Sequence, residues 1–273
     1  MLRSAKSWAG VLFAAFVVAG CASAPTQQPT TLKVAVANNL KPVMEDLARD
    51  YTARQPWIKF ELHFANTAKL EQSLQTSPFD LYIPARSISV DTLSDHGAIS
   101  PKSRYALGDN QLVVVAPQDS TLSYELTAAL IDPQVRQIAV VDPAHNMLGY
   151  LTHQVLITNH YLPSHDSSPL VQPEPAPVNN IEPKLLVVPD EAAVITAIKD
   201  GRAQVGITYS TFAMADKNVH ILSPFPLHTY ESVTYFTAIP RNAPNYEESW
   251  NFLNYLRSPQ ARAIMQRDGL LLQ

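Results

Sequence analysis

Apolar strands alternate with helical segments from Leu32 onward, and this alternation restricts the fold more than any other feature of the chain. Residues 32–37 alternate as a strand does, turn at Asn38-Asn39, and continue with apolar residues at helical spacing through Tyr51. A second such unit has a strand at 58–64 and a short helix at 69–74. Because strands that alternate with helices pair in parallel, the sequence predicts an α/β protein.

The rest of the chain continues this pattern. Further helices are predicted at 191–199 and, broken near Ser258-Pro259, at 247–266; further strands are predicted at 79–83, 112–116, 137–141, 205–209 and 232–239. Roughly 240 residues are enough for two lobes or one large domain.

The N-terminus has the pattern of a lipoprotein signal peptide. Arg3 and Lys6 precede an apolar stretch too short to span a bilayer, and the stretch ends in the run Val-Ala-Gly-Cys, whose last residue is Cys21. We therefore expect residues 1–20 to be removed and Cys21 to carry the lipid that anchors the protein to a membrane facing the periplasm or the cell exterior. The alternative is a soluble exported protein that is cleaved near Ala24.

Two segments are predicted to lie outside the regular structure. Residues 21–31 are small, polar and proline-bearing, as in a flexible tether. Residues 163–183 hold six of the 22 prolines, which predicts a surface insertion without regular structure. A tolerated loop is the simpler interpretation of that insertion, and a docking element is the alternative.

Charge and cysteine content exclude several classes of function. Residues 1–20 hold two of the 20 Lys and Arg residues and none of the 24 Asp and Glu residues, so the mature chain has a net charge of −6. An acidic surface does not favour nucleic acid, whose binding depends on neutralising phosphates. Cys21 is the single cysteine, so no intrachain disulfide is expected. No second apolar run approaches the length of a membrane span.

Two junctions between a strand and a helix carry polar side chains suited to an anion. Asn38-Asn39 and Asn66-Thr67 each lie beside the free backbone N–H groups of a helix start. Asn and Thr are also common helix caps, which is the simpler explanation for either junction alone. Two junctions at the carboxyl edge of one parallel sheet favour a ligand site, because open α/β sheets bind ligands there.

Other chemistries find little support in the sequence. His153, His160 and His165 lack the spacing of a zinc site, so no metal site is expected. Asp142 to His145 is interpreted as a turn after a strand, since no activated nucleophile accompanies it. The chain has only eight glycines and no phosphate-binding loop or dinucleotide fingerprint, so we expect neither an enzyme nor a cofactor.

Seven blocks of the sequence, in order, resemble the periplasmic molybdate-binding proteins of ABC transporters. They cover nearly all of residues 32–270 and lie at 32–44, 64–70, 78–85, 110–117, 141–145 with Gly149, 201–209 and 251–259. The resemblance implies two α/β lobes with mixed, mainly parallel sheets, joined by two crossover strands. Lobe 1 is expected to comprise residues 32–112 and 232–273, and lobe 2 residues 113–231. The implied function is to bind a small oxyanion between the lobes and present it to a membrane permease.

The resemblance also assigns ligand-binding positions. Side chains are expected to bind the anion at Asn39, Thr67 with its neighbour Asn66, and Tyr209, and backbone N–H groups at Leu148 and Glu191. Thr67 and Tyr209 keep the chemistry of the family. Asn39 donates from an amide in place of a hydroxyl, Leu148 replaces a small residue, and Asp190 with Glu191 brings two carboxylates to the rim.

These departures leave two alternatives open beside a molybdate-like ligand. One is a different, larger ligand that is neutral or cationic. The other is a two-lobe scaffold that now acts as a surface interaction protein.

Overall fold

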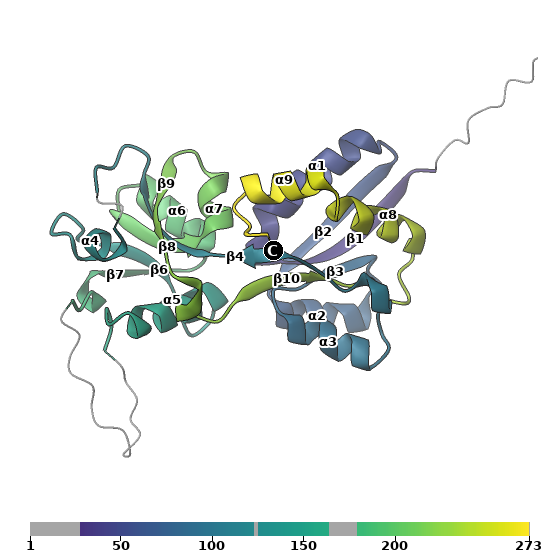
Figure 1. Cartoon of the computed structure of the whole chain (residues 1–273), viewed down its shortest axis with the longest axis horizontal. Coiled ribbons are helices and arrows are strands. Elements are labelled where there is room, and N and C mark those ends of the chain that lie inside the picture. Colours follow the sequence, from purple (N-terminus) through teal and green to yellow (C-terminus); the bar gives the residue numbers. More distant parts are fainter. Residues whose placement is uncertain (1–27, 123–124, 164–178, 273) are drawn as a thin grey trace, which may run out of the picture.

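The strand predicted at 32–37 is the centre of the first sheet. The computed structural model describes residues 28–122, 125–163 and 179–272. In it, β1 (Thr30–Ala37) pairs in parallel with β2 (Ile58–Ala65) on one side and β3 (Leu81–Ile83) on the other. Helix α1 (Lys41–Arg54) buries Val43, Met44 and Leu47 against one face. Helices α2 (Thr67–Thr76) and α3 (Ser87–Asp95) cover the other face (Figure 1).

The second sheet is mixed and has the order β7-β6-β8-β5-β9. Its strands are β5 (Leu112–Pro117), β6 (Ile138–Val141), β7 (Leu185–Val188), β8 (Val205–Tyr209) and β9 (Val219–Pro224). Strand β6 is parallel to β7 and β8, whereas β5 is antiparallel to β8 and β9. Its helices are α4 (Leu126–Ile131), α5 (Met147–Thr158), α6 (Glu191–Lys199) and α7 (Ser210–Ala215).

Two strands pass between the halves that carry these sheets. Strand β4 (Tyr105–Asn110) pairs antiparallel with β10 (Val233–Thr237), and both lie in the middle of the molecule (Figure 1). Only Gln111 separates β4 from β5, so the chain enters the second sheet without an intervening helix. This direct entry explains why β5 is antiparallel to its neighbours. The predicted α/β fold, with mixed sheets and two crossing strands, is confirmed.

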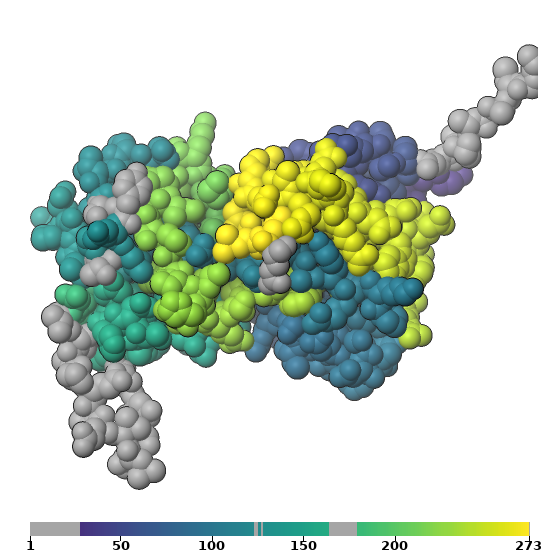
Figure 2. All heavy atoms as spheres, viewed as in Figure 1, coloured from purple at the N-terminus to yellow at the C-terminus, as the bar shows by residue number. Residues whose placement is uncertain are grey.

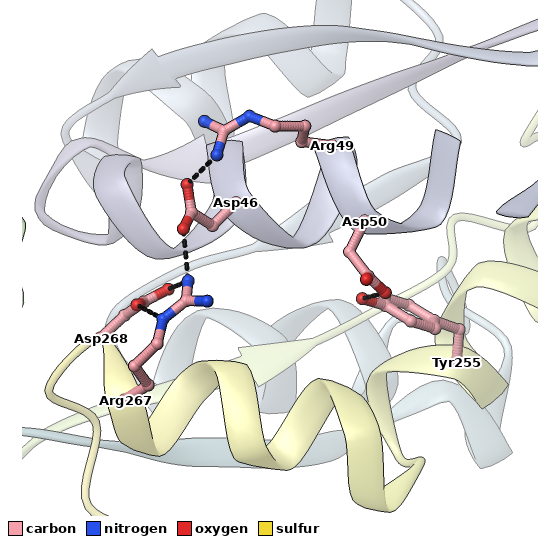
Figure 3. A network of polar contacts seen from close by, with 6 residues as sticks. All are labelled: Asp46, Arg49, Asp50, Tyr255, Arg267 and Asp268. Carbon is pink, nitrogen blue, oxygen red and sulfur yellow. Dashed lines mark hydrogen bonds and ion pairs between the residues drawn. The ribbon is translucent and has the colours of Figure 1, made fainter. Parts of the chain in front are cut away.

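The C-terminal helices α8 (Tyr246–Leu256) and α9 (Pro259–Arg267) pack on α1, and α9, in yellow, lies nearer the junction of the halves in Figure 2. Ser258 breaks them at the predicted place, because its Oγ accepts the N–H of Ala261 as a helix cap. Two polar contacts hold them to α1 (Figure 3): Arg267 pairs with Asp46, and the Tyr255 hydroxyl donates to Asp50 at 2.8 Å.

Several predictions concern residues that lie at or beyond the limits of the described structure. Strand β1 begins at Thr30, so the last two residues of the predicted tether belong to the sheet. The signal peptide, Cys21 and residues 164–178 of the proline-rich insertion lie outside the described residues. The residue limits of the two lobes stay a prediction. Short 3-10 turns complete the fold at η1 (Asn38–Leu40), η2 (Pro101–Ser103), η3 (Glu182–Lys184) and η4 (Leu227–Thr229).

Candidate ligand-binding site

A cleft of about 1400 Å³ lies between the two halves. Four junctions that follow parallel strands contribute to its lining: the turns after β1, β2 and β6, and the start of α6 after β7. Residues on these junctions include Asn39, Asn66, Thr67, Asn146 and Glu191. The cleft therefore lies at the carboxyl ends of strands from both sheets, where open α/β folds bind ligands.

Asn39 is almost completely buried at the end of the first junction, with 4% of its surface exposed. Its backbone carbonyl accepts hydrogen bonds from Thr211 Oγ1 at 3.1 Å and Asn110 Nδ2 at 3.4 Å. Its side-chain Oδ1 has no hydrogen-bond partner. The backbone at Asn39 is thus fixed from beneath, while its amide borders the cleft with unused hydrogen-bonding capacity.

Asn66 and Thr67 begin helix α2. Asn66 Oδ1 accepts the N–H of Lys69 at 3.0 Å, so this side chain caps the helix, as the simpler interpretation predicted. Thr67 is the first helical residue, is half-buried and lines the cleft. Both residues are therefore at the cleft, but the amide of Asn66 already has a structural role.

Leu148 lies in the first turn of α5 and is fully buried, with its side chain in the core. Its N–H, the expected anion donor, donates to Asn146 Oδ1 at 2.7 Å. Helix α5 packs so closely on the end of β6 that a Cβ on Gly149 would come within 2.4 Å of the Asp142 carbonyl oxygen. A glycine at position 149 is therefore required to hold this helix start at the cleft.

Glu191 is the first residue of α6, and its carboxyl group is buried at the cleft with 4% of the residue exposed. Burial raises the pKa of this carboxyl, and the neighbouring charge of Asp190 raises it further. Hydrogen bonds from the backbone N–H of Glu191 itself and from the Asn146 side chain act in the opposite direction. The N–H expected to hold the anion is therefore in contact with a carboxyl of the same residue.

Tyr209 ends β8 and is fully buried beneath the cleft. Its hydroxyl faces the Asn39 side chain, which is its one hydrogen-bond partner and holds it at a looser geometry than that of a standard hydrogen bond. Burial raises the pKa of this hydroxyl far above its usual range, and the field of Glu191 adds to the effect. Tyr209 is not among the residues that line the cleft, but its hydroxyl adjoins two that are, Asn39 and Glu191, and it is bonded only loosely to Asn39.

Sequence reasoning missed two features of the cleft. Asn146 joins the start of α5 to the start of α6, through Leu148 N–H and the Glu191 carboxyl. Its signal was present, since Asn directly before a helix is a favoured cap. Arg86 and Glu231, which also line the cleft, pair at 3.3 Å although 145 positions separate them. Only the tertiary fold brings that pair together.

The chemistry of the cleft is that of binding through hydrogen bonds. Asp142 to His145 forms the expected turn, in which Asp142 accepts from Ala144 N–H and pairs with exposed His145. Across residues 28–122, 125–163 and 179–272, no three His, Cys, Asp or Glu side chains gather as metal ligands would. The amide, hydroxyl and N–H groups around the cleft suit an anion, whereas the buried Glu191 opposes an anion without a proton.

Known proteins match the chain along almost its whole length. The molybdate-binding protein ModA of Escherichia coli is 27% identical over 281 residues, which cover 98% of this chain and 100% of ModA. YvgL of Bacillus subtilis, named as an ABC transporter substrate-binding lipoprotein, is 20% identical with 98% of each chain covered. The structure of the Azotobacter vinelandii periplasmic molybdate-binding protein superposes with a TM-score of 0.66 at 18% identity, over 89% of this chain and 99% of that one.

The structural match confirms the predicted two-lobe fold. The family model for bacterial extracellular solute-binding proteins matches residues 32–271. The chain therefore belongs to the bacterial extracellular solute-binding proteins, and its task is to bind a solute rather than to catalyse a reaction.

Proposed function

We propose that this protein is the solute receptor of an ABC transporter, and that it binds a small oxyanion of the molybdate and tungstate kind in the cleft between its lobes. The single observation that carries the proposal is a pair of buried polar groups next to the cleft, the Asn39 amide oxygen and the Tyr209 hydroxyl, which have no hydrogen-bond partner other than each other. Buried polar groups normally find partners, so an unused donor beside a cleft favours a ligand that accepts from it.

The two lobes supply complementary halves of the proposed site. Asn39, Asn66 and Thr67 line the cleft from the first sheet, and Glu191 lines it from the second. The Leu148 N–H and the Tyr209 hydroxyl belong to the second half too, but both residues are buried behind the cleft lining. Closure of the lobes over the ion replaces the internal bonds at Leu148 and Glu191 by bonds to ligand oxygens. Each charge-assisted hydrogen bond contributes about 1.5–3 kcal/mol in a site that excludes water.

The proposal includes delivery to a membrane. YvgL is named as an ABC transporter substrate-binding lipoprotein, and ModA as a molybdate-binding protein. The Cys21 pattern supports lipid anchoring outside the cytoplasm, with a permease as the partner that receives the closed form. In the described part of the chain, no helix has the length and apolar character of a membrane span.

A thermal-shift series on the purified full-length protein tests this function. Molybdate, tungstate, sulfate and phosphate are compared, because a ligand at 100 times its dissociation constant stabilises the folded state by about 2.7 kcal/mol. At least one of these ions is expected to raise the melting temperature by several degrees, and Thr67→Ala is expected to reduce that shift without lowering the melting temperature of the ligand-free protein. If none of the four ions raises it, oxyanion binding is wrong and the alternatives of an organic ligand or a protein partner take its place.

A further inference from the structure

The Glu191 carboxyl is the feature that a simple oxyanion site does not explain. It lines the cleft, is almost fully buried, and lies at the start of α6, where the proposed ligand would approach. Its hydrogen bonds come from its own N–H and from the Asn146 side chain, both neutral groups. A fully ionised carboxylate held there would face a dianion across a desolvated cleft, and like charges in such surroundings repel strongly.

In the part of the chain that the structure describes, the elements packed around α6, including β8, supply no compensating cation close to this carboxyl. Strands β5, β6 and β7 and helix α7 contain no ionisable acid or base of the Asp, Glu, His, Lys or Arg types. Strand β9 carries His220, and α6 itself carries Lys199 at its far end, where that side chain pairs with Asp216.

The ionisable groups whose fields reach Glu191 are acids or phenols: Asp190, Tyr209 and Tyr235. His145, which precedes Asn146 in the α5 turn, is paired with Asp142. Lys69 and Arg86 also line the cleft, but they belong to the other half, Arg86 pairs with Glu231, and neither is among the groups that act on the Glu191 carboxyl. Within the described residues, the surroundings of Glu191 therefore favour a proton on or next to its carboxyl.

We propose that the cleft binds its oxyanion together with one proton, which is held in a hydrogen bond between the Glu191 carboxyl and a ligand oxygen. The proposal rests on the oxyanion function proposed above and refines the ligand within that class. Hydrogen phosphate brings this proton with it at neutral pH. Sulfate and molybdate carry none at that pH, so their complexes must take one up from solvent.

The geometry makes Glu191 a specificity-determining residue. Asn146 and the helix start fix the carboxyl on the second-lobe side of the cleft, while Asn39 and Tyr209 leave unused polar atoms close by. A tetrahedral ion with one protonated oxygen satisfies this arrangement, since its hydroxyl donates to Glu191 and its other oxygens accept from the amides and the phenol. A proton-free dianion satisfies it only after Glu191 is protonated.

Calorimetric titration of the full-length protein tests the shared proton. Phosphate, sulfate and molybdate are titrated from pH 6 to 8.5 in two buffers of different ionisation enthalpy, which counts the protons taken up on binding. For the wild type we expect phosphate to bind at least about tenfold more tightly than sulfate at neutral pH. Above the pKa of Glu191, molybdate affinity is expected to fall about tenfold per pH unit, with about one proton taken up.

The variant Glu191→Gln removes the ionisable group but keeps a donor and an acceptor. It is expected to lose the proton uptake on molybdate binding and to narrow the preference for phosphate over sulfate by about tenfold or more. Asp190→Asn is the matched control, because it removes the neighbouring exposed carboxylate and retains a good helix cap. This variant should still take up one proton on binding molybdate. The pH dependence of its molybdate affinity should shift to lower pH, because the negative charge of Asp190 no longer raises the pKa of Glu191.

The outcomes separate the two proposals. If wild type and Glu191→Gln bind all three ions with equal affinities and without proton uptake, the shared proton is wrong while oxyanion binding stands. A folded Glu191→Gln protein that binds no oxyanion, beside a wild type that does, also contradicts the shared proton, because the amide keeps both hydrogen-bonding roles. If neither protein binds any of the ions, the proposed function fails and this inference fails with it.

Discussion

Two pairs of asparagine and tyrosine meet at the junction between the lobes, and they differ in how their hydrogen bonds are used. Asn110 donates to the Tyr235 hydroxyl at 2.8 Å and to Thr211 Oγ1 at 2.9 Å, and its Oδ1 accepts from Ser210 Oγ at 3.0 Å. Asn39 and Tyr209 are also buried, yet the Asn39 amide oxygen and the Tyr209 hydroxyl have no partner apart from each other.

This difference distinguishes polar groups that stabilise the fold from polar groups that are available to bind a ligand. The Asn110 network joins β4, β10 and the start of α7 where the chain crosses between lobes, so its bonds hold the junction together. The Asn39 amide oxygen and the Tyr209 hydroxyl lie next to the cleft and form no hydrogen bonds to other elements of the ligand-free protein. Substitutions in the first pair should therefore affect folding, and substitutions in the second pair should affect binding.

The largest expected effect is that of Asn110→Ala. It leaves several buried groups without their partner, at about 1–3 kcal/mol each, so we expect a loss of about 3 kcal/mol or more in the free energy of unfolding. At roughly 2–4 °C per kcal/mol for a protein of this size, the melting temperature should fall by about 6–12 °C. Asn39→Ala is the control and should cost less than about 1 kcal/mol. Equal losses for the two variants would remove the distinction between the pairs.

Substitutions of the two tyrosines should have smaller effects, one on stability and the other on ligand affinity. Tyr235→Phe removes one hydrogen bond of Asn110 and should cost about 1 kcal/mol of stability. Tyr209→Phe removes a hydroxyl that is bonded only loosely to Asn39, so the ligand-free protein should be about as stable as the wild type. Its affinity for the oxyanion should nevertheless fall by about tenfold or more. A Tyr209→Phe protein with unchanged affinity would exclude this hydroxyl from the site.

Glu191 makes stability depend on pH in a predictable direction. Because burial raises its pKa in the folded protein, the folded state holds this proton more tightly than the unfolded state does. At pH values well below 4.5, the ordinary pKa of this carboxyl, Glu191 is protonated in both the folded and the unfolded protein. As the pH rises above 4.5, the free energy of unfolding decreases until the carboxyl of the folded protein ionises as well. Chemical denaturation of the ligand-free protein should show this loss relative to Glu191→Gln. Parallel pH profiles for the two proteins would contradict it.

The smallest effect is expected at the rim of the cleft. Arg86 and Glu231 pair there with about half of each side chain exposed, and such pairs contribute about 0–1 kcal/mol. Glu231→Gln should change the melting temperature by no more than about 2–4 °C. A larger change would mean that this exposed pair holds the lobes together more strongly than its solvent exposure allows.

Much of the fold follows from local patterns. Strand β1, helix α6 with its end near Gly201, and the break at Ser258 were predictable from alternation, helical spacing and capping residues. Strands β4, β7 and β9 were not predicted, because their pairing depends on partners far away in the sequence. The antiparallel direction of β5 likewise follows from the crossing between lobes.

The candidate site was predictable only in part. The resemblance brought Asn39, Thr67 and Glu191 to one cleft, and the structure has all three there. It gave no indication that the N–H groups of Leu148 and Glu191 are already bonded within the chain, since that depends on how Asn146 and the Glu191 carboxyl are oriented. Orientation is a tertiary property that spacing along the chain does not encode.

A crystal structure of the protein with the oxyanion that gives the largest thermal shift tests the central claim most directly. The account predicts one ion in the cleft, with its oxygens at hydrogen-bonding distance from the Asn39 side chain, Thr67 and the Tyr209 hydroxyl, and with one oxygen against the Glu191 carboxyl. An ion bound elsewhere, or a cleft in which Asn39 and Tyr209 still lack partners, would contradict it.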